Sequence, residues 1–150
     1  VCFVIQASKN RLSDRQHYII SSVLSLFGKD IVNNIVFLIT HSDGLPPQNV
    51  LRAINKARIP CRRDRTNQPV HFLFNNRQAD ARHSERRYLR AQRDAWEDSM
   101  EETNKFLQSL DEKNRKSLEL TSNVLIERIQ FEAFICNLQL QIQEKESKKT

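Results

Sequence analysis

The stretch NNIVFLITHSDGLPP, residues 33–47, joins an apolar run to a polar turn. The run IVFLI has no polar residue alternating with its apolar ones, which is typical of a strand at the centre of a parallel sheet. Gly44 then ends the strand, and Pro46 and Pro47 suit the first turn of a helix. Four apolar residues at helical spacing continue that helix: Val50, Leu51, Ile54 and Ala57. The stretch therefore predicts a central strand followed by a helix.

Two further strands are expected on either side of this unit. VCFVIQAS, residues 1–8, has five apolar residues in succession, as in a strand buried on both faces. Residues 13–16, SDRQ, match a capping box that starts a helix, and Gly28 is a suitable stop for it. PVHFLFNN, residues 69–76, is the third strand. The alternation of strands and helices predicts an α/β fold with a parallel sheet of about three strands and flanking helices.

The remainder of the chain, from about residue 79, is charged and free of glycine, and it predicts a long helical extension. Near its end, apolar residues approximate a three-four spacing that Glu127 interrupts: Leu120, Val124, Phe131, Ile135, Leu138 and Ile142. Such a stripe suits a helix packed on the domain or on a second copy of itself. We therefore hypothesise from the sequence that the chain forms a homo-oligomer through these helices.

Composition sets the broad class of the protein. With 39% hydrophobic and 28% charged residues the chain can bury a core, and no apolar run is long enough to span a bilayer. Only 2 glycines and 4 prolines disfavour an all-β fold. The odd, scattered cysteines Cys2, Cys61 and Cys136 suit free thiols, so we expect a cytoplasmic protein. Because Val1 opens inside an apolar run, we also expect a fragment of a longer protein.

Polar side chains follow each predicted strand where its apolar run stops. They are Gln6-Ala7-Ser8, Thr40-His41-Ser42-Asp43 and Asn75-Asn76. Ligands of open parallel sheets bind at the carboxyl ends of the strands, so these groups could share one rim. A carboxylate such as Asp43 can accept two N–H bonds from the edge of guanine, and an amide can donate to a base oxygen. Ordinary turn chemistry is the alternative for each stretch.

These residues resemble known motifs. Thr40-His41-Ser42-Asp43 followed by Gly44-Leu45 resembles the fourth guanine motif of GTPases, usually Asn-Lys-x-Asp. The form with threonine first is similar to that of the immunity-associated (GIMAP, or avirulence-induced) GTPases, within the septin-like P-loop GTPases. Phe74-Asn75-Asn76 resembles the base-contacting Phe-Asn-Asn of that family, and residues 12–35 resemble its helix between the third and fourth motifs. The charged helical tail also fits.

The resemblance implies a division of the chain and a binding role. Residues 1–80 would be the C-terminal half of a guanine-nucleotide-binding domain with a truncated P-loop-type sheet, and residues 81–150 a charged helical extension that could form a coiled coil. The ligand would be GTP or GDP. Five residues would form the base site: Thr40 as part of the motif, Asp43 on the guanine edge, His41 beside the base, and Asn75 or Asn76 as further base contacts.

The phosphate end of such a site is missing from the sequence. A Gly-x-x-x-x-Gly-Lys-Ser/Thr loop is needed to hold phosphate and Mg²⁺, and a chain whose only glycines are Gly28 and Gly44 cannot contain one. Phosphoryl transfer depends on positioning those phosphates and the metal ion. We therefore expect no GTP hydrolysis by this chain alone, and Mg²⁺ only in a full-length parent.

Other functions are weighed against these. A non-enzymatic interaction module, in which the sheet supports helices that recruit a partner, is the main alternative. Arginines at helical spacing could bind nucleic acid or anionic lipid: Arg82, Arg86, Arg87, Arg90 and Arg93. Acidic residues follow them at once, which favours a solvated, self-paired helix and disfavours nucleic acid. The four histidines lack metal-ligand spacing, and Cys61 beside Arg62 and Arg63 is interpreted as an inert surface thiol.

Overall fold

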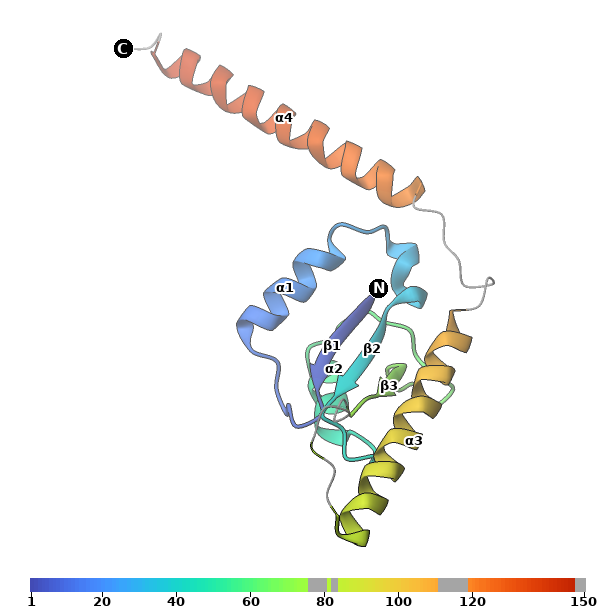
Figure 1. Ribbon diagram of the computed structural model, residues 1–150. Helices are drawn as coiled ribbons and strands as arrows, with labels where there is room; N and C mark the ends of the chain where they lie inside the picture. Colours follow the sequence, from blue (N-terminus) through green and yellow to red (C-terminus); the bar gives the residue numbers. More distant parts are fainter. Residues whose placement is uncertain (76–80, 82–83, 111–118, 148–150) are drawn as a thin grey trace.

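The computed structural model describes residues 1–75, 81, 84–110 and 119–147 (Figure 1). Its centre is a parallel sheet of β1 (Cys2–Gln6), β2 (Val36–Thr40) and β3 (His71–Leu73), in the order β1-β2-β3. The register pairs Val4 with Leu38 and Leu38 with Phe72. These elements confirm the predicted α/β class with a small three-stranded parallel sheet, flanking helices and a long C-terminal helix.

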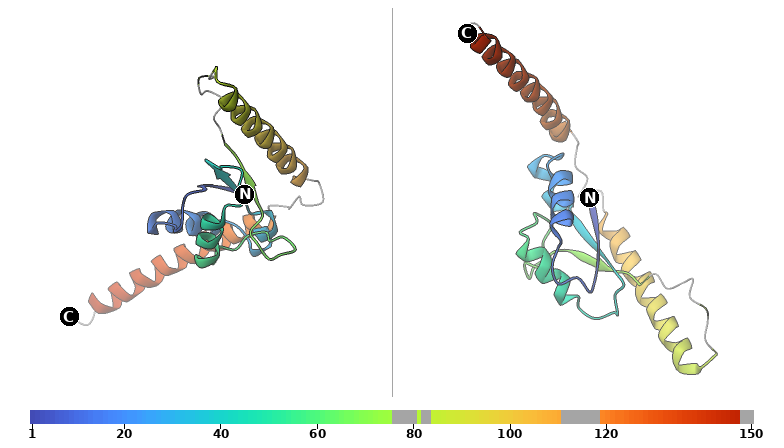
Figure 2. Two further views of the ribbon diagram at one scale, coloured as in Figure 1. Left: turned by 90° about the horizontal axis from the view of Figure 1, so that it is seen from below. Right: turned by 90° about the vertical axis from the view of Figure 1, so that its left-hand side faces the viewer.

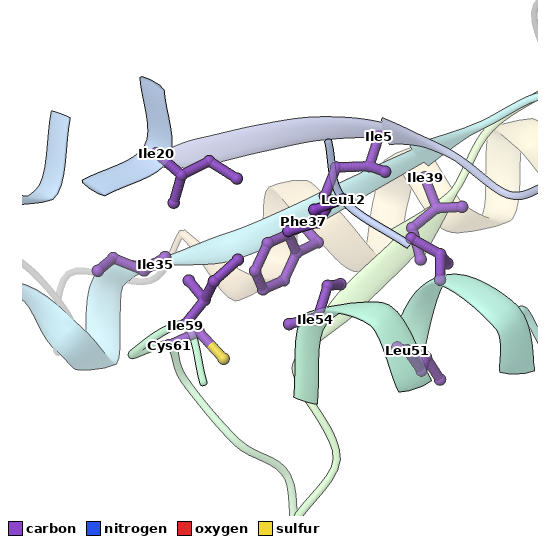
Figure 3. Close-up of a cluster of buried hydrophobic side chains, with 11 residues drawn as sticks. Ile5, Leu12, Ile20, Ile35, Phe37, Ile39, Leu51, Ile54, Ile59 and Cys61 are labelled. Carbon is purple, nitrogen blue, oxygen red and sulfur yellow. The ribbon is translucent and has the colours of Figure 1, made fainter. Parts of the chain in front are cut away.

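One face of the sheet carries the hydrophobic core. Helices α1 (Asp14–Leu24) and α2 (Gln48–Lys56) pack there, as right-handed crossovers require when the strands follow in sequential order. Phe37 and Ile39 of β2 are fully buried between them (Figure 3). The other core residues come from β1, both helices and the loops: Ile5, Leu12, Ile20, Ile35, Val50, Leu51, Ile54, Ile59 and Cys61.

The structure confirms the predicted start of α1 but not its predicted end. Ser13 Oγ accepts a hydrogen bond from the backbone N–H of Gln16, and Gln16 Oε1 accepts from the N–H of Ser13, which confirms the capping box. The helix ends at Leu24, with Ser25 as its C-cap, rather than at Gly28. Gly28 instead begins a 3₁₀ helix, η1 (Lys29–Asn34), which leads into β2.

Helix α3 (Arg86–Ser109) lies against β3 on the face opposite to the core (Figure 1). The rings of Phe72 and Phe106 meet edge to face with centroids 5.3 Å apart. Glu102 Oε2 accepts a hydrogen bond of 3.0 Å from the backbone N–H of Leu73. The first helix of the predicted extension is thus part of the layered fold.

The β1 strand is not buried on both faces, contrary to the sequence prediction. It forms one edge of the sheet, and α3 covers the β3 side of the second face. Val4 is consequently 64% exposed and Cys2 is exposed, whereas Ile5 points into the core. The apolar run at the start of the chain therefore contains residues with two different environments.

The last helix, α4 (Glu119–Ser147), extends away from the rest of the protein (Figures 1 and 2). Only its first turn lies against the domain. The backbone N–H of Gly28 donates to Thr121 Oγ1 at 3.4 Å, and a β-carbon at position 28 would lie 2.7 Å from Leu120 Cδ2. Gly28 therefore permits the close approach of α4, and the helix beyond Val124 is exposed.

Candidate functional site

The polar residues after the three strands lie side by side, as the parallel topology predicts. The backbone N–H of Ala7 donates to the carbonyl of Thr40 at 2.9 Å, which joins the ends of β1 and β2. The N–H of Ser42 donates to the carbonyl of Phe74 at 3.2 Å, which joins the ends of β2 and β3. The carboxyl ends of the strands thus form one continuous rim.

The turn after β2 has an unusual backbone. His41 has a φ of 56° and Gly44 a φ of 81°, both in the left-handed region. This conformation is natural for glycine and uncommon for other residues, and strain of this kind clusters at functional sites. His41 is exposed, and its Nδ1 lies 3.2 Å from Oγ1 of the half-buried Thr40. The turn therefore presents the His41 side chain on the surface of the rim.

Asp43 stabilises this turn directly. Its Oδ1 accepts a hydrogen bond of 3.0 Å from the backbone N–H of Leu45, while the buried Ser42 uses its Oγ to accept from the N–H of Gly44 at 3.1 Å. Asp43 is therefore a turn-forming residue, as the alternative interpretation of the sequence predicted. An ionised carboxylate offers about four acceptor positions, and the Asp43 side chain is exposed, so the turn bond leaves capacity for a ligand.

Asn75 lies at the end of β3, next to this turn. It is half-buried and directly follows Phe74, whose carbonyl is bonded to Ser42. The rim therefore brings Thr40, His41, Asp43 and Asn75 to one edge of the sheet. Asn76, the fifth residue of the predicted base site, lies outside the described residues.

A further carboxylate at the rim was missed by the sequence interpretation. A β-carbon at position 44 would lie 3.3 Å from Oδ2 of Asp98, so α3 places this side chain beside the turn. Nothing in the local sequence identifies Asp98, because its position depends on how α3 is rotated against the sheet. Asp43 and Asp98 make the rim electronegative, which suits a ligand edge rich in N–H donors and opposes a phosphate group.

The arginines of α3 form an exposed basic segment. Arg86, Arg87, Arg90 and Arg93 are exposed, and Arg82 lies outside the described residues. The Arg87 guanidinium stacks 4.6 Å from the centroid of the Tyr88 ring. Within the described residues these arginines form no ion pair with the acidic residues that follow. The ion pairs seen on α3 join Lys105 to Glu101 and Glu102, at 2.8 and 2.9 Å.

The sequence also made predictions about Cys61 and about metal sites. Cys61 is buried in the core and is not a surface thiol; burial raises its pKa, although the charge of Arg63 acts in the opposite direction. Among the described residues, no three His, Cys, Asp or Glu side chains are grouped so that they could hold a metal ion. In the same part of the chain, no helix is both long and apolar enough to cross a membrane.

Comparisons with known proteins identify no relative of this chain. A scan against protein-family models and searches of the curated proteins and of the solved structures return no match. The resemblance to the GIMAP family therefore depends on the motif residues of the sequence.

Proposed function

We propose that the rim at the carboxyl ends of β1, β2 and β3 is the base-recognition half of a guanine-nucleotide site in a GIMAP-like, P-loop-type GTPase domain. The observation that carries this proposal is the exposed carboxylate of Asp43 at the end of the central strand, beside Asn75 at the end of the next strand. Asp43 accepts from the N–H groups of the guanine edge, His41 lies beside the base, and Asn75 contacts a base oxygen.

The strand order supports this proposal. In doubly wound nucleotide-binding sheets each half has its strands in sequential order, and the ligand sits where the two halves meet. The order β1-β2-β3 is the order of one such half, with β1 as the strand that would meet the other. The missing half would hold the phosphates and Mg²⁺. The residues of this rim fit the base of GTP or GDP and do not fit its phosphates, so hydrolysis is not part of the proposal.

The test separates the turn role of Asp43 from its ligand role. Guanosine and adenosine are titrated into the isotope-labelled protein, and chemical shifts of the rim amides are followed. We expect guanosine to shift the amides of residues 40–45 and of Asn75, with adenosine much weaker because it leaves the carboxylate without its donors. Equal responses to both nucleosides would reject base recognition by Asp43.

Asp43→Asn provides the matched variant. The asparagine oxygen can still accept from the N–H of Leu45, so the turn is kept while the charge and the second acceptor are lost. We expect guanosine binding to weaken by roughly tenfold or more, the effect of leaving a polar ligand group unpaired. Asp64→Asn is the control, because Asp64 also caps a turn, through Thr66 and Gln68, but lies in a different loop.

A non-enzymatic interaction module is the second candidate, and one observation favours it. The large apolar side chains of α4 are exposed along most of the helix, and single exposed apolar residues are ordinary whereas a contiguous set marks a binding surface. Guanine recognition at the rim and recruitment by α4 involve different elements, so either can hold without the other.

A further inference from the structure

Helix α4 has two apolar stripes rather than one. At about 100° per residue, one stripe, here called stripe A, contains Leu120, Val124, Phe131, Phe134, Ile135, Leu138 and Ile142. Stripe B lies on the opposite side of the helix and contains Leu125, Ile126, Ile129, Ala133, Cys136 and Leu140. Between the two stripes run polar flanks, one with Asn123, Gln130 and Gln141 and the other with Arg128, Glu132 and Gln139.

Beyond Val124, neither stripe is covered by the described part of the protein. Phe131 is 63% exposed and Phe134 is 58% exposed, whereas the fixed contacts of α4 are made by its first turn at Gly28. The sequence had allowed α4 to pack on the domain, and the structure does not place it there. An apolar surface of this length therefore lacks an intramolecular partner among the described residues.

The charges on the side of stripe A have an order along the helix. Glu127 lies towards its start and Lys145 towards its end, both in line with stripe A. Arg128 and Glu132 lie on a flank, where Arg128 Nε and Glu132 Oε1 pair with each other at 3.3 Å. Glu127 and Lys145 lie about 27 Å apart along the helix at 1.5 Å per residue, so they cannot pair within one chain.

We propose that stripe A binds stripe A of a second copy of this chain in an antiparallel, two-fold symmetric pair. In this alignment Phe131 faces Ile142 and Ile135 faces Leu138 of the other copy. Glu127 lies on the same side of the contact as Lys145 of the other copy, offset by one residue or about 1.5 Å along the helix. Each contact occurs twice because the interface is isologous. A parallel pair would place Glu127 against Glu127 and Lys145 against Lys145, so the charges select the antiparallel arrangement.

The size of stripe A sets the strength of this pair. Its five apolar side chains from Phe131 to Ile142 expose roughly 400 Å² in total, taking 150–250 Å² for a whole aromatic side chain and less for an aliphatic one. Stable interfaces bury about 800 Å² per partner. The pair is therefore a weak dimer that dissociates on dilution, with stripe B left outside the interface.

The apolar part of the proposal is tested by sedimentation of the whole chain from roughly 1 µM to 1 mM, the range of weak complexes. We expect a concentration-dependent dimer that Ile135→Lys with Leu138→Lys abolishes. The matched control is Ile129→Lys with Leu140→Lys on stripe B, which should leave the dimer unchanged. Circular dichroism verifies that both variants keep their helix. A monomer at all concentrations, or equal loss in both variants, would overturn the proposal.

The orientation is tested by charge reversal. Glu127→Lys and Lys145→Glu should each weaken the dimer by about tenfold, because each creates two like-charge contacts in place of two exposed ion pairs. The double variant should restore dimerisation to within about twofold of the original chain. Single variants without effect would reject the antiparallel pair. This inference rests on the interaction role of α4, and its outcome is independent of guanosine binding at the rim.

Discussion

Phe37 and Phe131 are the same residue type in two contrasting regions of one chain. Phe37 of β2 is 0% exposed, between α1 and α2, whereas Phe131 of α4 is 63% exposed. In the sheet region the core side chains are covered by helices and loops near them in the sequence. The apolar side chains of α4 past Val124 have no such cover among the described residues, although their spacing is as regular. Regular apolar spacing thus predicts a contact surface but does not identify which molecule supplies the other side.

The largest expected effect comes from exchanging these two phenylalanines for alanine. Phe37→Ala should destabilise the protein by about 3–5 kcal/mol, because it removes buried contacts and leaves a cavity. Phe131→Ala should change the free energy of unfolding by no more than about 0.5 kcal/mol. Urea denaturation at a protein concentration low enough to keep α4 monomeric measures both. Comparable losses would show that α4 packs within its own chain.

A smaller effect is expected at the start of α1, where local chemistry fixes an element of the sheet region. Ser13→Ala removes the capping bond to Gln16 and should cost about 1 kcal/mol of stability. Ser22→Ala, on the exposed surface of the same helix, is the control and should stay within about 0.5 kcal/mol. Thermal unfolding distinguishes the two. If they are equal, the capping box does not contribute to the stability of this region.

The smallest effect concerns the loop before β3 and depends on pH. Hydrogen bonds from the Thr66 hydroxyl and the Gln68 backbone hold the pKa of Asp64 below its usual value. A lowered folded pKa means that the stabilisation is present above the unfolded pKa of about 3.9 and is lost as the pH falls through the folded value. The stability difference between the original chain and Asp64→Asn should therefore shrink from pH 7 towards pH 3. A constant difference would assign the effect to packing.

The sequence predicts the parts of this fold that depend on local chemistry and chain order. The strand and turn of residues 33–47, the capping box and the parallel sheet are all confirmed, because each follows from residues close together in the chain. The adjacency of the strand ends at the rim also follows, since parallel strands bring their carboxyl ends to one edge.

The parts that were missed depend on which elements pack together. The exposure of Val4 results from β1 lying at the edge, the burial of Cys61 from the loop that folds under the core, and the approach of Asp98 from the rotation of α3. The second stripe of α4 was missed for a different reason. The sequence prediction named a single three-four repeat, which corresponds to stripe A. Stripe B has equally regular spacing on the opposite side of the helix.

The hydrogen bond from Leu73 to Glu102 makes the two borders of the sheet unequal. On the β3 border, the backbone N–H of Leu73, which could donate to another strand, already donates to the Glu102 carboxylate of α3. On the β1 border, no described residue adds a fourth strand. The β1 border is therefore the more open of the two to pairing with a further strand, from another segment or another molecule.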